Sequence, residues 1–412
     1  MEYVKREIEE EIQQYIDAQE IIAVVGPRQA GKTTLFKKFQ KDLENSNYIS
    51  FEDRDILRVF EEDEKEFAEI YLEEYDYLLI DEFQYANQGG KKLKYLYDEY
   101  PEKKIMITGS SAADMTIEGL KYLTGRVLKF NLYPFSFREF LKYINEELYN
   151  VFEKREQKLQ EWVKGEGELS LTEATLEKLE ALRKEYAVYG GYPRVVLSDS
   201  EEEKKKVLDN IVETYLIREI GDVLNISDDR EMKDLMRILA LQMGEKTKYN
   251  KVSQRTGINY NKLKERLNVL EHTFVLEQVR PFYTNKQKEI SKQPKIYFYD
   301  NGFRNTLINN FQELEMRNDQ GELNENFFFT QARTELKYWR TKSQAEVDFV
   351  KENQEINAFE IKTAPKTTKS IRSFQEKYSP ENMVVMNQEK IQKNDSEIFI
   401  PLIFAQEAGE LN

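Results

Sequence analysis

The chain has 412 residues, which at roughly 150 residues per domain predicts two or three domains. It contains no cysteine and a single histidine, which excludes disulfides, thiolate metal sites and, nearly, a histidine triad, and favours a cytoplasmic protein. The formal charge of −15 argues against nucleic-acid binding over the whole surface. No apolar run approaches the roughly 20 residues that span a bilayer, so we expect no membrane partner.

The first informative element is Ile21–Leu35, in which a short apolar run leads into Gly-x-x-x-x-Gly-Lys-Thr. The β-branched run predicts a buried parallel strand, and a helix is expected after it. Between them, Gly26 and Gly31 let backbone N–H groups point at phosphate oxygens, Lys32 reaches the β- and γ-phosphates, and Thr33 ligates Mg²⁺. An ordinary glycine-rich turn is the alternative. The predicted nucleotide-binding residues are Gly26, Pro27, Arg28, Gln29, Ala30, Gly31, Lys32, Thr33 and Thr34, with ATP and Mg²⁺ as cofactors.

A second buried strand, Tyr77–Phe83, ends in two carboxylates. This segment is similar to a Walker B strand, in which Asp81 would hold Mg²⁺ through water and Glu82 would polarise the attacking water. An acidic pair without function is the alternative, but the spacing from the first strand fits one βαβ crossover and one more helix. We therefore expect Asp81 and Glu82 on a strand neighbouring the first one. A third strand, Lys104–Thr108, precedes Ser110, whose hydroxyl would contact the γ-phosphate or the lytic water.

Two later segments, Leu123–Arg126 (LTGR) and Leu132–Phe140 (LYPFSFREF), complete a resemblance to the AAA-type P-loop ATPases. Most of the chain is similar to a prokaryotic branch in which a winged helix and a C-terminal domain of the PD-(D/E)xK nuclease superfamily follow the ATPase. The resemblance implies that Ser110 is a sensor residue. It also implies that Arg126 senses the γ-phosphate, either in cis or from a neighbouring subunit of a homo-oligomer.

The segment Gly190–Arg194, with the sequence GGYPR, is similar to the lid of these ATPases. The resemblance implies that Pro193 and Arg194 lie near the nucleotide. For Arg126 and Arg194 the alternative is an ordinary salt bridge on a solvated face.

The region 246–266 holds seven basic residues and one acidic residue, although the chain as a whole is acidic. It predicts two short helices, Asn250–Thr256 and Tyr260–His272, with Gly257 at the bend, as in a helix-turn-helix. Two predicted strands, Val275–Phe282 and Lys295–Asp300, follow with a lysine-rich loop between them, as in a winged helix. DNA contact and a purely protein-binding or interdomain role are both open. The predicted nucleic-acid contacts are Lys251, Arg255, Lys262, Lys264, Arg266, Lys286 and Lys288.

The C-terminal third places Asp348 in one alternating segment and Glu360-x-Lys362 in the next. If the turn between these strands is centred near Gln354, Asp348 lies opposite Glu360, and Lys362 projects from the same face as Glu360. Asp348 and Glu360 would then hold Mg²⁺, while Lys362 orients or deprotonates the water that attacks a phosphodiester. A salt-bridged hairpin is the alternative.

This pattern resembles the core of the PD-(D/E)xK nucleases. Upstream, Gly321–Asn326 is similar to the start of the first helix of that family, whose acidic residue also faces the metal. The resemblance therefore assigns that role to Glu325, with Glu335 as a substitute. It leaves open whether such a domain cleaves DNA or only binds it.

The predicted fold class is α/β, with an AAA-type parallel sheet, a helical lid, a winged helix and an α/β nuclease-like domain. We expect the ATPase core with a helical insertion in residues 1–185, the lid in 186–221, the winged helix in 222–305 and the nuclease-like domain in 306–412. The leading hypothesis is a Mg²⁺-dependent ATPase that binds and remodels or processes DNA. The alternatives are an ATP-operated switch or scaffold with a non-catalytic nuclease-like module, and a transcription regulator that acts through the winged helix alone.

Overall fold

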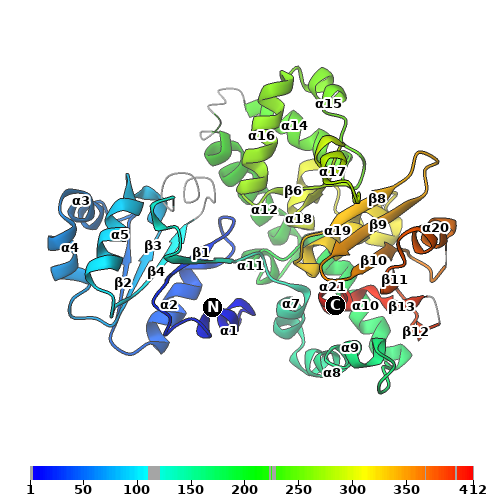
Figure 1. The fold of residues 1–412 in the computed structure, drawn as a ribbon, viewed down its shortest axis with the longest axis horizontal. Helices are drawn as coiled ribbons and strands as arrows, with labels where there is room; N and C mark the ends of the chain where they lie inside the picture. Colours follow the sequence, from blue (N-terminus) through cyan, green and yellow to red (C-terminus); the bar gives the residue numbers. More distant parts are fainter. Residues whose placement is uncertain are drawn as a thin grey trace. The chain divides into compact units, whose positions relative to one another are not determined.

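The computed structural model of the chain describes residues 3–109, 121–221, 224, 229–366, 368–394 and 397–411 (Figure 1). These residues form two compact units. Unit 1 consists of Met1–Phe135 and Asn268–Val275, and unit 2 consists of Ser136–Leu267 and Leu276–Asn412. Among the described residues, no helix is both long and apolar enough to cross a lipid bilayer.

Unit 1 is built on a parallel sheet whose described strands follow the order β2-β3-β4-β1-β5. The strands are β1 (Ile21–Val25), β2 (Ser46–Ser50), β3 (Tyr77–Asp81), β4 (Lys104–Gly109) and β5 (Val127–Asn131). The predicted strands are confirmed, but the expectation that the strands of the two motifs are direct neighbours is wrong. Strand β4 pairs with both β1 and β3 and separates them. The carboxyl ends of β1 and β3 are therefore about 10 Å apart, or two strand spacings.

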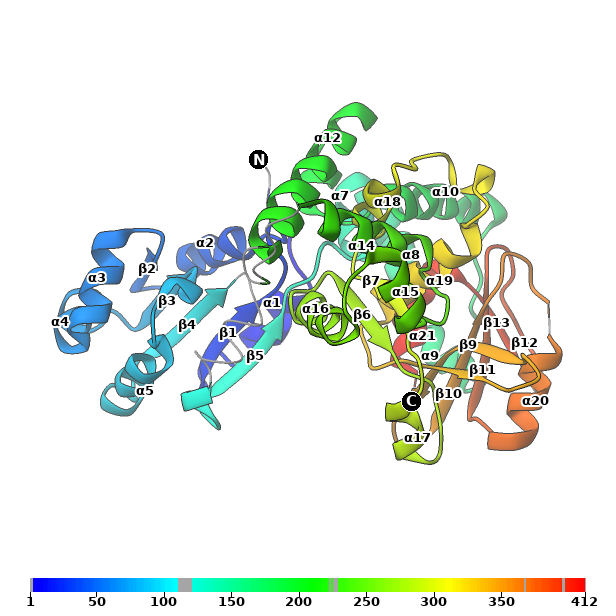
Figure 2. The ribbon, with the colours of Figure 1, turned by 90° about the horizontal axis from the view of Figure 1, so that it is seen from above.

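Helices cover both faces of this sheet, because parallel strands need crossover connections. The chain crosses the sheet in one direction from β1 to β2 and in the opposite direction from β3 to β4. Right-handed crossovers therefore place α2 and α5 on opposite faces, as Figure 2 shows. The helices of unit 1 that precede β5 are α1 (Ile8–Gln13), α2 (Lys32–Asp42), α3 (Arg54–Glu62), α4 (Glu64–Tyr71) and α5 (Gly89–Glu99).

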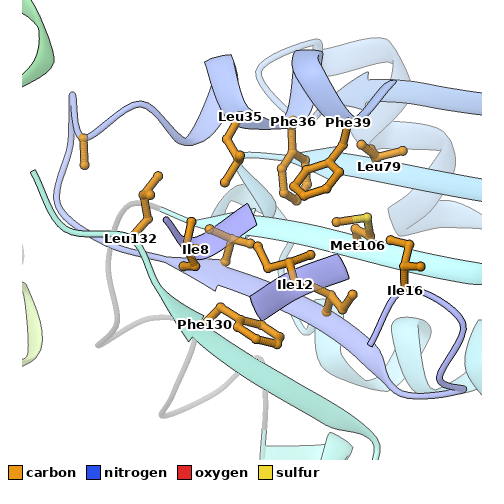
Figure 3. Packing of buried hydrophobic residues seen from close by; sticks show 13 residues of the cluster. Ile8, Ile12, Ile16, Leu35, Phe36, Phe39, Leu79, Met106, Phe130 and Leu132 are labelled. Atoms are coloured by element: carbon orange, nitrogen blue, oxygen red, sulfur yellow. The ribbon is translucent and has the colours of Figure 1, made fainter. Parts of the chain in front are cut away.

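The core under α1 and α2 follows the two-residue period of the strands. Leu79 of β3 and Met106 of β4 face this core (Figure 3). Ile22 and Val24 of β1 belong to the same core. The intervening residues of the same strands are also buried, because helices cover the other face as well. This double coverage explains why β1 is apolar at every position.

Unit 2 begins with a run of helices. Helix α16 has the predicted bounds, and α15 begins one residue earlier than predicted. The helices of this region are α7 (Phe137–Ile144), α8 (Glu146–Glu156), α9 (Leu159–Val163), α10 (Glu173–Tyr189), α11 (Pro193–Val196), α12 (Glu201–Ile211), the π-helix Val212–Ile220, α14 (Asp229–Leu241), α15 (Tyr249–Thr256) and α16 (Tyr260–His272). Short 3₁₀ turns occur at Phe83–Tyr85, Lys121–Leu123, Leu314–Met316 and Leu402–Phe404.

An antiparallel pair, β6 (Leu276–Val279) and β7 (Lys295–Phe298), follows α16. The lysine-rich connection between these strands contains a helix that the sequence analysis did not anticipate, α17 (Lys286–Ser291). Helices α18 (Asn301–Ile308) and α19 (Gln320–Ala332) then lead into the second sheet.

The second sheet is mixed, and its described strands follow the order β12-β13-β11-β10-β9-β8. Strands β9 and β10 pair antiparallel with Phe359 opposite Phe349, which confirms the predicted register around Gln354. The pairing of β8 with β9 shifts register between Lys337 and Trp339, near Asp348. The remaining elements are β8 (Lys337–Arg340), β9 (Glu346–Glu352), β10 (Ile356–Ile361), α20 (Lys369–Tyr378), β11 (Asn382–Asn387), β12 (Gln392–Lys393), β13 (Ile398–Pro401) and α21 (Ala405–Glu410).

Candidate nucleotide site and acidic centre

The loop between β1 and α2 has the backbone geometry of an anion cradle. Gly31 is the N-cap of α2 with φ of 102°, a conformation that favours glycine. A Cβ atom on Gly26 would lie 2.1 Å from the carbonyl oxygen of Leu132, so only glycine fits there. No side chain of the described residues caps α2, which leaves its first N–H groups to face the loop. The loop can therefore accept an anion.

Lys32 closes this loop from within. Its side chain is buried, and the ammonium donates to the carbonyl oxygens of Gly26 and Pro27 at 2.9 and 2.8 Å. A phosphate in the cradle would compete with these two carbonyls for the ammonium. The predicted phosphate-binding lysine is thus already directed into the loop.

Arg6 supports the loop, although the sequence analysis did not identify it. Its guanidinium donates to the carbonyl oxygens of Ala30 and Tyr133 at 2.8 and 2.7 Å and lies over the ring of Phe135. These bonds tie the nucleotide loop to the chain that follows β5. No sequence motif marks Arg6, because its partners are backbone atoms far away in the sequence.

Asp81 lies at the carboxyl end of β3, buried among hydrogen-bond donors. One of its oxygens accepts from the Tyr48 hydroxyl at 2.7 Å, and the other accepts from Thr108 and from the backbone N–H of Glu82. Burial and the nearby Asp81 raise the pKa of Tyr48. Glu82 has φ of 55°, and its N–H also donates to Thr108 at 3.1 Å. Tyr48 and Thr108 therefore fix the carboxylate of Asp81, and Thr108 also holds the backbone of Glu82. Sequence reasoning missed both.

The oxygen atoms of Thr33 and Asp81 suit Mg²⁺, which prefers oxygen ligands and keeps several of its waters. Thr33 presents a hydroxyl in the first turn of α2. Both carboxylate oxygens of Asp81 already accept hydrogen bonds, which favours contact with the metal through water over direct ligation. The residues thus fit the predicted roles of Thr33 and Asp81.

Arg126 occupies the opposite edge of the sheet from the nucleotide loop. It directly precedes β5, which pairs parallel with β1, so it lies at the amino ends of the strands. Its guanidinium contacts Asp98 at 3.0 Å and lies over the ring of Tyr97. About five residues of strand, or roughly 16 Å, separate this edge from the carboxyl edge. This arrangement gives no support to a contact in cis, which stays a prediction. Ser110, the predicted sensor, lies outside the described residues.

The GGYPR segment forms a tight joint inside unit 2. Gly190 has φ of 76°, and a Cβ there would lie 2.2 Å from a carboxylate oxygen of Asp300. The Gly191 N–H donates to Asp300 at 2.7 Å, and Asp300 also caps α18. Pro193 starts α11, and Arg194 is exposed. Their contact with a nucleotide stays a prediction.

Glu325, Asp348, Glu360 and Lys362 come together in an acidic centre in unit 2. The Lys362 ammonium lies 2.9 Å from Glu360 and 3.6 Å from Asp348. The Tyr297 hydroxyl donates to Glu325 at 2.7 Å. Burial and the Asp348 charge raise the pKa of Glu360, and one of its buried oxygens has no partner among the described residues. The four residues predicted for this site therefore share one neighbourhood.

Lys295 is the main component of this centre that the sequence analysis missed. Its ammonium is buried and lies 2.6 Å from Glu346 and 3.6 Å from Glu325. The available signal is the alternation of β7, in which Lys295 and Tyr297 share one face of a short, otherwise apolar strand. The centre is thus built from β7, α19, β9 and β10 together.

The metal-binding expectation for this centre has less support. Within the described ranges, no group of three acidic residues converges as a metal cage. The Lys362 ammonium already lies in contact with both Asp348 and Glu360. Glu335 is largely exposed, so the structure gives no support to it as a substitute for Glu325.

The predicted nucleic-acid contacts divide into two sets. Arg266 is buried against Glu231, which argues against a phosphate contact by this residue. Lys286 is exposed and pairs with Glu352 at 2.6 Å. The side chain of Lys288 lies outside the described residues. Four predicted contacts on the helix pair are exposed: Lys251, Arg255, Lys262 and Lys264.

The similarity to curated relatives extends along the chain well beyond the nucleotide site. An uncharacterized protein of Haemophilus influenzae is 25% identical over 313 residues, covering 72% of this chain and 71% of the relative. An uncharacterized protein of Methanocaldococcus jannaschii is 27% identical over 355 residues, covering 82% of this chain and 73% of the relative. Among solved structures, a Walker-type ATPase of Pyrococcus abyssi is 13% identical with a TM-score of 0.48, covering 74% of this chain and 96% of that chain.

Family models divide the chain into three matched regions. Residues 180–314 match the Domain of unknown function (DUF8612), and residues 320–404 match the Domain of unknown function (DUF4143). Residues 18–141 match the AAA domain. This last match contains the nucleotide loop, Asp81 and Glu82. The chain therefore carries an AAA domain of the P-loop ATPase type.

Proposed function

We propose that this protein is a Mg²⁺-dependent ATPase that couples hydrolysis to the binding and remodelling or processing of DNA. The ATPase part of the proposal rests on the residues at the carboxyl edge of the first sheet. There the glycine loop with Lys32, and the Asp81–Glu82 pair fixed by Thr108, lie two strands apart. We infer that a bound triphosphate and its attacking water lie between these two groups.

Each residue at this edge has a distinct role. The N–H groups of the loop and Lys32 bind the phosphate oxygens, and Thr33 and Asp81 hold the metal ion, which supplies charge neutralisation when bound. Glu82 accepts a proton from the water that attacks the γ-phosphorus. The bond to the β,γ-bridging oxygen then breaks, which releases ADP and phosphate. Thr108 keeps Glu82 in place by accepting its backbone N–H at 3.1 Å.

The DNA part of the proposal rests on the helix pair α15–α16. We infer a winged-helix module from this pair and the following strands β6 and β7. Its four exposed basic residues stand out in a chain of net charge −15. Such a surface neutralises phosphates and binds DNA in a salt-dependent way.

For the acidic centre we propose a PD-(D/E)xK-like site that grips or cuts the bound DNA. Support comes from the register of β9 and β10 and from the meeting of Glu325, Asp348, Glu360 and Lys362. A second function, an ATP-operated switch with a non-catalytic module, is favoured by one observation. Lys362 pairs with both carboxylates that would otherwise bind a metal.

A single set of assays tests these proposals. ATP hydrolysis is measured with and without linear, single-stranded and branched DNA, and the same reactions are run on gels. We expect DNA to stimulate the wild type, and Lys32→Ala and Glu82→Gln to abolish turnover. Any cutting should be lost in Asp348→Ala and Lys362→Ala while ATP hydrolysis continues. A rate indifferent to every DNA, with no cutting, would instead support the switch.

A further inference from the structure

The segment between α14 and α15 makes an isolated antiparallel bridge with β7. The Gly244 N–H donates to the carbonyl of Ile296 at 3.0 Å, and the Thr247 N–H donates to that of Pro294 at 2.8 Å. Lys246 is the antiparallel bridge partner of Lys295. The segment that precedes α15 is therefore hydrogen-bonded to β7, the strand that supplies Lys295 to the acidic centre.

The side chain of Lys246 lies on the face of this ladder that borders the acidic centre. Residues directly opposite each other in an antiparallel pair project to the same side, and Lys295 reaches Glu325 and Glu346 from that side. Gly244, two residues before Lys246, is on the same side, because a Cβ there would lie 3.2 Å from a carboxylate oxygen of Glu325. Lys246 is thus a half-buried cation at the rim of the centre.

Further cationic side chains lie near Lys246, on β8 and on the helix pair. Arg340, at the end of β8, contacts Glu346 at 2.7 Å, and burial and the Arg340 charge lower the pKa of Lys246. Lys248 is exposed at the start of α15. On α16, Lys264 lies 6.0 Å from the centre of the ring of Tyr249, the residue that follows Lys248. A row of cations therefore connects the exposed face of the helix pair with the acidic centre.

We propose that this row is the path of one DNA strand, whose phosphates contact Lys248, Lys246 and Arg340 between the helix pair and the acidic centre. The inference rests on the proposed DNA function and makes the two sites one continuous binding surface. Charge supports this path, because a strand carries one phosphate about every 3.4 Å, and cations along it release its counterions. The strand is either free or part of a duplex, and both are included in the test.

The test compares DNA binding of the full chain with that of two triple variants. Fluorescence anisotropy follows a labelled single strand and a labelled duplex while salt is raised. In Lys246→Gln/Lys248→Gln/Arg340→Gln we expect affinity to fall about tenfold or more and the logarithmic salt slope to drop by about 2. The control is Lys154→Gln/Lys158→Gln/Lys164→Gln, which removes the same number of positive charges from an exposed region elsewhere in unit 2. This control should bind as the wild type does.

The outcomes separate this inference from the function on which it rests. If the wild type binds DNA and both variants bind equally well with equal salt slopes, the path is wrong while the DNA function stands. If the wild type binds neither probe, the DNA function itself fails, and the path fails with it. A larger loss for the single strand than for the duplex would assign the path to unpaired DNA.

A second measurement uses the absence of cysteine from the chain, which allows one introduced thiol to be labelled alone. Lys342 is exposed in the turn two residues after Arg340. An iron-EDTA reagent on Lys342→Cys should cut bound DNA over a narrow range of nucleotides, whereas the same reagent on Lys154→Cys should not. DNA that is bound but uncut by the Lys342→Cys conjugate would overturn the proposed path.

Discussion

Single residues decide the shape of the nucleotide loop, and Gly26 is the strictest case. In Gly26→Ala the new Cβ would lie 2.1 Å from the Leu132 carbonyl oxygen, so either the loop or the chain after β5 has to move. We expect loss of ATP binding by calorimetry and a lower melting temperature. The control is Gly321→Ala in α19, where no atom lies within 4 Å of the new Cβ. It should keep ATP binding and gain up to about 1 kcal/mol of stability, and equal behaviour of the two variants would contradict the role of Gly26.

The buried carboxyl group of Asp300 leads to a prediction for how the free energy of unfolding depends on pH. Burial raises its pKa to about 6, even though it accepts N–H groups from Phe303 and Gly191. Between about pH 4 and pH 6 the folded state holds this proton more tightly than the unfolded chain, so Asp300 lowers the free energy of unfolding as pH rises. Asp300→Asn lacks this titration. The difference in unfolding free energy, wild type minus variant, should fall by about 2 kcal/mol over that range. Chemical denaturation at several pH values measures it, and a constant difference would refute the assignment.

The residues of the nucleotide loop could be predicted because their chemistry is local in sequence. Gly26, Gly31 and Lys32 act within one strand, turn and helix. Arg6 and Lys295 could not, because each meets partners that are distant in the sequence. The same limit applies to the Arg266 side chain, whose burial against Glu231 depends on the packing of α14 against its neighbours.

At the scale of elements, β7, α19 and β9 are joined through Lys295. Removing its buried ammonium in Lys295→Met leaves the partly buried Glu346 and Glu325 without this cation, which should cost about 3 kcal/mol of stability. The control is Lys286→Met, whose ion pair with Glu352 is largely exposed and should contribute less than about 1 kcal/mol. Urea unfolding compares the two. Similar losses would mean that Lys295 is not an internal counter-ion of the acidic centre.

The elements themselves were largely predictable, and their order in space was not. The periodicity of apolar residues, and the glycine and polar residues that bound each segment, predicted β1, β3 and α16. The turn near Gln354 predicted the register of β9 with β10. The insertion of β4 between β1 and β3 follows from crossover connections that no short motif encodes. The register shift of β9 against β8 likewise depends on pairing between strands, and such irregularities often re-aim side chains near sites.

At the scale of the whole molecule, Arg126 has two possible roles that the sequence does not distinguish: a surface ion pair, or a contact with the nucleotide of a neighbouring copy. Because it lies at the amino edge of its own sheet, away from its own nucleotide loop, we expect it to be either a surface ion pair with Asp98 or a residue that completes the site of a neighbouring copy. A surface pair predicts nearly normal ATP hydrolysis in Arg126→Ala, because such pairs contribute little. A shared site predicts loss of hydrolysis with ATP binding retained.

Mixing two inactive variants distinguishes a shared site from a damaged fold. Arg126→Ala keeps Glu82, and Glu82→Gln keeps Arg126, so an oligomer that contains both has some sites with one intact residue from each copy. Random assembly of an equal mixture should restore about a quarter of the wild-type rate. Light scattering on the same mixture establishes that an oligomer is present. If it is present and the mixture stays inactive, Arg126 does not act across copies, and its loss of activity reflects the broken contact with Asp98. Restored activity would make assembly a requirement for hydrolysis, because no single chain would hold a complete site.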